Sequence, residues 1–370
     1  MLRFSCEKSL LQAAINTAGR AVSSKSSISA LEGLLLEGKE MLTLSGYNMQ
    51  TGIRTSFDAD IQESGRIVLN ARLFGEIIRK MPDDVVIFSS DEKFMVHLTC
   101  GDACFDILGL SAEDYPDLPE VDDDFSVSLP QKTLKAMINQ TSFAVSTNES
   151  RPIHTGSLFE INEQGLTIVS VDGFRLALRR EALEKIDGGA FRFVAPGSAL
   201  KEVESICQET DELIQIIQGK RHLLFESGNT QLICRRLEGE FLDYKNAIPR
   251  NNPICVQVDT KTMMQSIDRV SVVISEKMKS PIRCVFDEGR VYLSSETGNG
   301  KANDICPVDG SGEGLVIGFN NRYLMDALRY VPAERVNMQL NTGISPCIIT
   351  PLEGEQENFL YMVLPVRLRG

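Results

Sequence analysis

The chain has 370 residues, of which 42% are hydrophobic and 24% are charged, a balance typical of a globular protein of two or three domains. Its formal net charge of −13 argues against a protein that binds nucleic acid over its whole surface. No apolar run approaches about 18 residues, so we expect no membrane-spanning helix. Charged residues at Arg3, Glu7 and Lys8 interrupt any signal-like apolar core, and we expect a cytoplasmic protein.

Six segments have the apolar spacing of helices that bury one face. The expected helices are 8–22, 72–80, 131–145, 198–209, 259–274 and 320–330. Asn70 and Asn320 stand where two of these helices need an N-cap. The chain between the helices alternates like short strands, as in 166–170 and 290–294, with turn residues between them. An α+β fold, with helices on one side of antiparallel sheets, is therefore expected.

The same pattern occurs three times along the chain. Short similar stretches at 21–26, 144–149 and 273–278 each precede an apolar run, at 34–37, 157–160 and 284–287. Leu73, Leu200 and Leu324 mark corresponding points of the later helices. Polar linkers follow residues 120 and 249. We therefore expect three repeated modules, each of two helices plus antiparallel sheets, at 1–120, 125–249 and 254–370.

Signatures of an enzyme or of a metal site are incomplete. Gly33 to Lys39 has the spacing of a phosphate-binding loop, but Glu40 replaces the required hydroxyl residue and the intervening residues form a buried-strand pattern. The glycine-rich stretch 310–314 is expected to be a hairpin loop. Nine cysteines are scattered, three histidines do not complete a zinc site, and we expect reduced cysteines and no cofactor. The sequence predicts a protein that is not an enzyme.

Charge is distributed unevenly between the helices and the rest of the chain. The six expected helices together carry a small positive charge, which leaves the remainder strongly acidic. A mildly basic face on an acidic body follows if the helices face one way. Ordinary solvated helix faces are an equally acceptable interpretation of the charges alone.

Several short motifs together resemble one family. They are Val171-Asp172-Gly173-Phe174-Arg175-Leu176-Ala177, Asp243-Tyr244, Gly318-Phe319-Asn320-Asn321-Arg322-Tyr323 and Tyr361-Met362-Val363-Leu364-Pro365-Val366-Arg367-Leu368. With three repeated modules, they make the whole chain similar to the bacterial DNA polymerase sliding clamps, the polymerase III beta subunits.

The resemblance implies a head-to-tail homodimer, in which six modules close a ring around duplex DNA. Helices would line the hole and attract phosphates without reading sequence. The residues expected to face the hole or its rim are Arg20, Lys25, Arg72, Lys132, Lys135, Arg151, Lys277 and Lys279. Those that it places at the dimer interface are Phe105 and Ile107 of one chain, and Val273 and Ile274 of the other.

The resemblance also implies a groove that binds short linear peptides of the replicative polymerase, the clamp loader and repair proteins. Mapped onto this chain, the groove comprises His154, Thr155, Asp172, Gly173, Phe174, Arg175, Leu176, Leu242, Asn320, Tyr323, Ile344, Met362, Leu364, Pro365, Val366, Arg367 and Leu368. His154 stands where the family usually has an aliphatic residue. An alternative interpretation, less favoured even without the resemblance, is that the C-terminal apolar run is simply an edge strand.

The expected function is that of a processivity factor in DNA replication, a soluble ring at the nucleoid with no membrane partner. Two other classes stay open from the residues alone. A scaffold of repeated modules without a DNA role would lack a basic lumen, and an enzyme would need a metal or cofactor to copurify.

Overall fold

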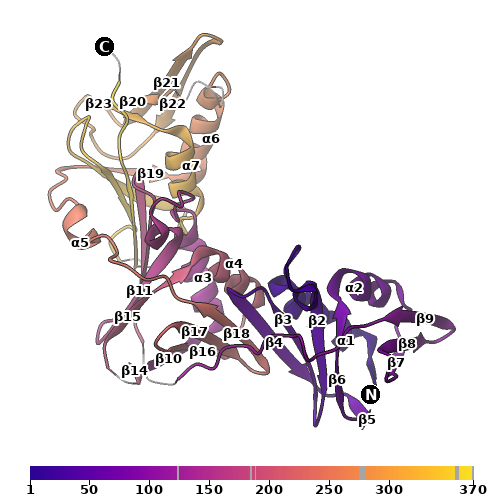
Figure 1. Cartoon of the computed structure of the whole chain (residues 1–370). Helices are drawn as coiled ribbons and strands as arrows, with labels where there is room; N and C mark the ends of the chain where they lie inside the picture. Colours follow the sequence, from indigo (N-terminus) through magenta and orange to yellow (C-terminus); the bar gives the residue numbers. More distant parts are fainter. Residues whose placement is uncertain (123–124, 184–185, 188, 275–279, 355–357, 369–370) are drawn as a thin grey trace. The chain divides into compact units, whose positions relative to one another are not determined.

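The computed structural model describes residues 1–122, 125–183, 186–187, 189–274, 280–354 and 358–368 (Figure 1). The chain divides into two compact units. The first contains residues 1–134, 187–189 and 201–236, and the second contains 135–186, 190–200 and 237–370. In the described ranges, every helix is too short or too polar to cross a membrane.

The first unit is built on two sheets. The five-stranded sheet has the order β5-β1-β7-β8-β9, with strands Asp60–Glu63, Arg3–Glu7, Val85–Ser90, Met95–Cys100 and Ala103–Leu108. The nine-stranded sheet has the order β14-β10-β16-β17-β18-β4-β3-β2-β6, with strands Ile186–Asp187, Phe125–Pro130, Leu213–Gln218, His222–Ser227, Thr230–Arg235, Thr51–Phe57, Leu42–Tyr47, Gly33–Gly38 and Gly65–Asn70. From β10 to β6, all neighbouring strands are antiparallel.

Two helices close the core of this unit. Helix α1 (Lys8–Ala18) and helix α2 (Ala71–Lys80) bury Leu11, Phe74 and Ile78 against the inner faces of the strands. Burial of each such side chain contributes about 1.5–3 kcal/mol. Asn70 caps α2 by accepting a hydrogen bond from the Leu73 N–H at 2.9 Å, as predicted. Along β2, Leu34 and Leu36 belong to this core, while Leu35 belongs to a separate cluster under the segment that follows β9.

The second unit also has two sheets. The eight-stranded sheet has the order β15-β11-β12-β13-β26-β25-β24-β19, with strands Phe191–Pro196, Gly156–Asn162, Gly165–Val171, Arg175–Glu181, Asn358–Val363, Cys347–Thr350, Arg335–Leu340 and Ile254–Asp259. The four-stranded sheet has the order β22-β21-β20-β23, with strands Gly300–Pro307, Arg290–Thr297, Ile282–Asp287 and Leu315–Phe319. Helices α6 (Thr260–Ser271) and α7 (Asn321–Arg329) pack together over one continuous core.

The expected α+β fold and all six expected helices are confirmed, but several helices end earlier than predicted. Helix α3 spans Gln131–Ser142, α4 spans Gly197–Ile206, and α1 gives way to a 3₁₀ turn at Gly19–Ala21. The apolar spacing continues beyond the ends of these helices, because Val22 and Ile274 pack against the cores without being helical. Short helix α5 (Tyr244–Ala247), capped by Asp243, was not predicted.

The sheet order repeats between the two units. Strands β6-β2-β3-β4-β18-β17-β16-β10 of the first unit correspond, in order and direction, to β15-β11-β12-β13-β26-β25-β24-β19 of the second. The main chain repeats as well. The N–H of Leu110 bonds to Val68 O, that of Leu237 to Val194 O, and that of Val366 to Gly318 O. The internal repeat expected from the sequence is therefore present in the backbone.

Two smaller predictions have different outcomes. Gly33–Gly38 is the largely buried strand β2, in agreement with its rejection as a phosphate-binding loop. The stretch 310–314, however, does not close a hairpin, because the strands that it connects, β22 and β23, lie at opposite edges of their sheet. Its glycines reflect positive φ angles at Gly310 and Gly314 instead. All nine cysteines are free, and most are buried, as expected.

Candidate functional site

A tight turn between β12 and β13 begins the candidate groove. The Asp172 carboxylate accepts hydrogen bonds from the N–H groups of Phe174 at 2.9 Å and Arg175 at 3.0 Å. Gly173 has φ +90°, a conformation that favours glycine. The turn leaves the Phe174 side chain 56% exposed, which is costly for an aromatic residue unless a partner covers it.

Arg175 joins this turn to helix α7. Its guanidinium bonds to Asp172 Oδ2 at 2.9 Å and to Asp326 Oδ2 at 2.6 Å, while only 12% of its side chain is exposed. The same guanidinium lies over the Tyr323 ring at 4.7 Å and the Phe143 ring at 5.4 Å. A charge so buried is stable only when it is paired, as it is here on two sides.

Phe174 and Tyr323 form an aromatic wall. Their rings are stacked with centroids 5.6 Å apart. Burial, followed by the Asp172 carboxylate, raises the pKa of Tyr323, so its hydroxyl stays protonated near neutral pH. The wall therefore offers the exposed ring of Phe174 and the hydroxyl of Tyr323.

The C-terminal segment forms the other border. Strand β26 lies between β13 and β25, so the interpretation of this run as an edge strand is wrong. Beyond β26, the Leu364 N–H donates to Phe174 O at 2.9 Å and the Val366 N–H donates to Gly318 O at 2.8 Å. A Cβ on Gly318 would lie 2.6 Å from Val366 O, so glycine permits this close approach. The segment is therefore held at Leu364 by the turn before β13 and at Val366 by β23, the strand before α7.

An apolar cluster would form the floor of the candidate groove. Leu176 and Met362 are buried in one cluster, and Ile153, Phe241 and Leu364 pack against it while partly exposed. His154 stands edge-on to Phe241, with ring centroids 5.4 Å apart. Burial, followed by the charge of Arg151, lowers the pKa of His154, so the ring is neutral at pH 7.

Some predicted groove residues lie apart from this floor or use their polar atoms internally. Asn320 Oδ1 caps α7, and the Thr155 hydroxyl donates to Pro152 O. Val366, Arg367 and Leu368 line a separate hollow of about 790 Å³ with residues of β20, β21 and β22. Ile344 is 73% exposed in the turn between β24 and β25.

Three residues of the site were missed by the sequence analysis. Phe241 contacts His154, Asp326 pairs with Arg175, and Phe143 lies under the same guanidinium. Phe241 could have been found, because it is the aromatic neighbour of Leu242. Asp326 is 151 residues from Arg175, and no local pattern joins them.

The predicted DNA-facing residues vary in their surroundings. Lys25, Arg72 and Arg151 are exposed. Arg20 pairs with Glu202 at 3.2 Å and Lys132 pairs with Asp211 at 2.7 Å, which reduces the positive charge that each presents. Lys135 is half-buried. Lys277 and Lys279 lie outside the described residues.

Two of the predicted interface residues lie on an edge strand, and a third, Val273, lies close to Gly300 at the start of the edge strand β22. Phe105 and Ile107 belong to β9, the edge of the five-stranded sheet, and Phe105 is 36% exposed. Val273 and Ile274 follow α6, and Val273 O accepts a hydrogen bond from the hydroxyl of Thr297, at the end of β21. Val272, 82% exposed, was not predicted.

Comparisons with known proteins cover the whole chain. Three family models match in order: the N-terminal domain of the DNA polymerase III beta subunit at residues 2–119, its central domain at 128–243 and its C-terminal domain at 245–367. The chain is 32% identical, over 380 residues, to the beta sliding clamp of Halalkalibacterium halodurans, covering 99% of this chain and all of that protein. The beta sliding clamp of Staphylococcus aureus is also 32% identical, over 379 residues, with 99% of this chain and all of that protein covered.

Solved structures agree with this assignment. A DNA polymerase III beta subunit from Eubacterium rectale has a TM-score of 0.93 at 32% identity, with 99% of both chains covered. The DNA polymerase sliding clamp of Bacillus subtilis has a TM-score of 0.94 at 28% identity, with both chains fully covered. The chain belongs to the family of DNA polymerase III beta subunits, the beta sliding clamps.

Proposed function

We propose that this chain is a DNA sliding clamp, a processivity factor without catalytic activity of its own. Two copies form a ring of six modules around duplex DNA, and each copy tethers DNA-processing proteins through its peptide groove. The modules are 1–120, 125–249 and 254–370. Family membership over the full chain supports the clamp role.

The observation that supports a ring is a strand pairing that occurs twice within the chain and is missing a third time. Strand β4 pairs with β18, and the corresponding strand β13 pairs with β26. By the same repeat, β22 is the third strand of this kind and β9 is the third partner, yet each lies at the edge of its sheet. Antiparallel pairing of β9 in one copy with β22 in another completes the pattern and covers both edges.

Such pairing is heterologous, because two different surfaces meet. Heterologous contacts close a ring only when the rotation between copies is suitable, and two copies of three similar modules satisfy this with a turn of about 60° per module. Phe105, Ile107, Val273 and Ile274 lie on or beside these two edges and would be buried by the pairing. The dimer is therefore head-to-tail.

DNA is held by enclosure and by diffuse attraction. Neutralising a few phosphates releases counterions without reading bases, which permits sliding. The whole chain has a net charge of −13, and its excess acidic residues, placed on the outer surface, would repel DNA there. We assign the attraction to the exposed cations Lys25, Arg72 and Arg151, together with the other predicted positions. This role places the protein on the chromosome, in the cytoplasm.

The groove determines which proteins bind to the clamp. An extended peptide with aliphatic or aromatic side chains fits the apolar floor and the Phe174–Tyr323 wall. We expect its sources to be the replicative polymerase, the clamp loader and repair proteins. Micromolar affinity is sufficient, because clamp and polymerase on one DNA have a high effective mutual concentration.

Light scattering together with primer extension tests the proposal. The chain should have twice the mass of one copy and should lengthen the products that its cognate polymerase makes per binding event. A monomer that leaves product length unchanged would reject the proposal. A dimer that leaves product length unchanged would favour the scaffold alternative.

A further inference from the structure

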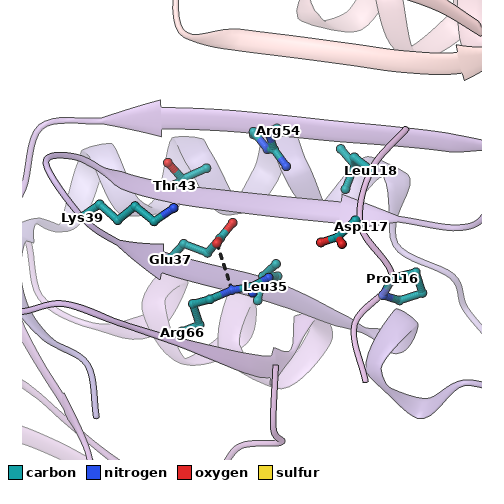
Figure 2. A pocket seen from close by; sticks show the side chains of 9 residues that line it. All are labelled: Leu35, Glu37, Lys39, Thr43, Arg54, Arg66, Pro116, Asp117 and Leu118. Carbon is teal, nitrogen blue, oxygen red and sulfur yellow. Dashed lines mark ion pairs between the residues drawn. The ribbon is translucent and has the colours of Figure 1, made fainter. Parts of the chain in front are cut away.

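A polar pocket lies on the outer face of the nine-stranded sheet, in the first unit. Its volume is about 360 Å³, within the range of small-molecule sites. Strands β2, β3, β4 and β6 form its floor, and the segment Pro116–Leu118 forms one wall (Figure 2). None of the predicted peptide, DNA or interface residues lines it.

The register of the strands brings charged side chains into this pocket. Glu37 lies opposite Arg66 and Thr43, and Ser45 lies opposite Arg54. Arg66 Nε bonds to Glu37 Oε1 at 2.9 Å, so these two charges offset each other.

The other charged side chains of the pocket have no oppositely charged partner among the described residues. Arg54 bonds only weakly, through Nε to Ser45 Oγ at 3.4 Å. Within the described ranges, the side chains of Lys39 and Asp117 have no hydrogen-bond or ion-pair partner. Figure 2 shows the Lys39 amine and the Asp117 carboxylate entering the pocket from opposite sides. Two cations and one anion are thus available to a ligand.

The internal repeat shows that the fold does not require such a pocket. In the second unit, Glu160 lies opposite Arg192 just as Glu37 lies opposite Arg66. There, however, the Tyr244 hydroxyl bonds to Glu160, and Lys245 Nζ lies 3.2 Å from it. In the second unit, side chains of the protein itself therefore occupy the position that corresponds to the pocket.

The row of residues next to the Glu–Arg pair is also more polar in the first unit than in the second. Val194, Leu158, Val169 and Leu178 lie side by side across the second unit and are all buried in an apolar cluster. The corresponding row of the first unit is Val68, Leu35, Ser45 and Arg54. The first unit has a hydroxyl and a guanidinium where the second has two aliphatic side chains.

We propose that this pocket binds a small organic anion. The oxyanion, phosphate or carboxylate, binds the Arg54 guanidinium and the Lys39 amine, because a guanidinium fork matches two oxygens of either group. A hydroxyl of the same ligand donates to Asp117 and offsets its carboxylate. The ligand bridges the sheet to Pro116–Leu118 and so stabilises the folded unit.

Calorimetric titration of the full chain with sodium glycerol 3-phosphate and with malate tests the proposal. At least one probe should bind saturably and raise the unfolding midpoint, and the tighter probe identifies the oxyanion. Arg54→Gln and Lys39→Gln should each weaken binding by about tenfold, the usual effect of losing one charged hydrogen bond. Lys93→Gln, which removes an exposed lysine outside the pocket, should leave affinity unchanged.

Inorganic phosphate and Asp117→Asn test the second contact. Glycerol 3-phosphate should bind more tightly than inorganic phosphate, and Asp117→Asn should reduce that preference. Equal binding of glycerol 3-phosphate and inorganic phosphate, with malate binding no more tightly than either, would mean an adventitious anion only and would overturn the proposal. Absence of saturable binding by either organic probe, or full binding to the Arg54→Gln, Lys39→Gln double variant, would overturn it as well.

Discussion

Arg175 and Asp326 form an ion pair of 2.6 Å that joins the turn after β12 to helix α7. The two residues belong to different expected modules. The pair sets the position of Tyr323 against Phe174, because the same guanidinium lies over the Tyr323 ring. The aromatic wall of the proposed groove therefore depends on this ion pair.

Arg175→Ala should leave Asp172 and Asp326 without their cation and release the Tyr323 ring. We expect a loss of about 1–3 kcal/mol in the free energy of unfolding, because both carboxylates keep some access to water. Urea titration measures this, and peptide affinity should fall in parallel. Arg329→Ala, an exposed position on the same helix, is the control and should change neither quantity.

Phe174→Ala should weaken peptide binding by about tenfold or more, since it removes one face of the wall. Met49 offers a matched control. Met49 lies in a turn with the same hydrogen-bond pattern as the turn at Asp172, because the N–H groups of Gln50 and Thr51 donate to Asn48 Oδ1. Met49 is 55% exposed. Met49→Ala should leave fluorescence titration with a groove peptide unchanged. Equal losses in the two variants would place the peptide elsewhere.

Peptide affinity should depend on pH through His154. Burial and Arg151 lower the pKa of this ring in the folded chain, so folding favours its neutral form. Its contribution to stability is fully present above the unfolded pKa of about 6.5 and is lost as the pH falls through the lower folded value. An apolar peptide against the ring opposes protonation further. Affinity should be constant above about pH 7 and should decline in acid.

His154→Leu is the matching variant. It should bind an aliphatic-aromatic peptide more tightly, because apolar surface replaces a polar ring, and it should remove the acid decline due to this residue. A decline of the same size in the variant would show that another group is responsible.

The double substitution Val273→Asp, Ile274→Asp should give monomers in light scattering. Two carboxylates beside β22 would be buried, unpaired, in the proposed pairing with β9. Val272→Asp is less informative, because the free chain already exposes this side chain. A double variant that remains dimeric with normal circular dichroism would place the interface elsewhere.

Much of the fold followed from local patterns in the sequence. Apolar spacing predicted six helices, and Asn70 and Asn320 marked the start of two, because caps and periodicity depend on near neighbours. The ends of helices were less predictable, since Val22 continues the apolar spacing in a non-helical conformation.

The site was less predictable than the fold. Asp172, Gly173 and Phe174 form a contiguous motif, but Phe143 and Asp326 reach Arg175 through tertiary structure alone. The proposed anion pocket was even less predictable from the sequence, because its side chains come from four strands and a wall segment. Their convergence depends on strand register, which single-sequence patterns do not specify.

Release from DNA on linearisation tests the central claim most directly. The protein is loaded by its clamp loader onto a nicked circular plasmid, separated from free protein by gel filtration, and the plasmid is then cut once. An encircling ring should stay with the circle at moderate salt and slide off the ends after cutting, because enclosure rather than phosphate contact retains it. Retention that is equal on circular and linear DNA, and that disappears with salt on both, would contradict the account.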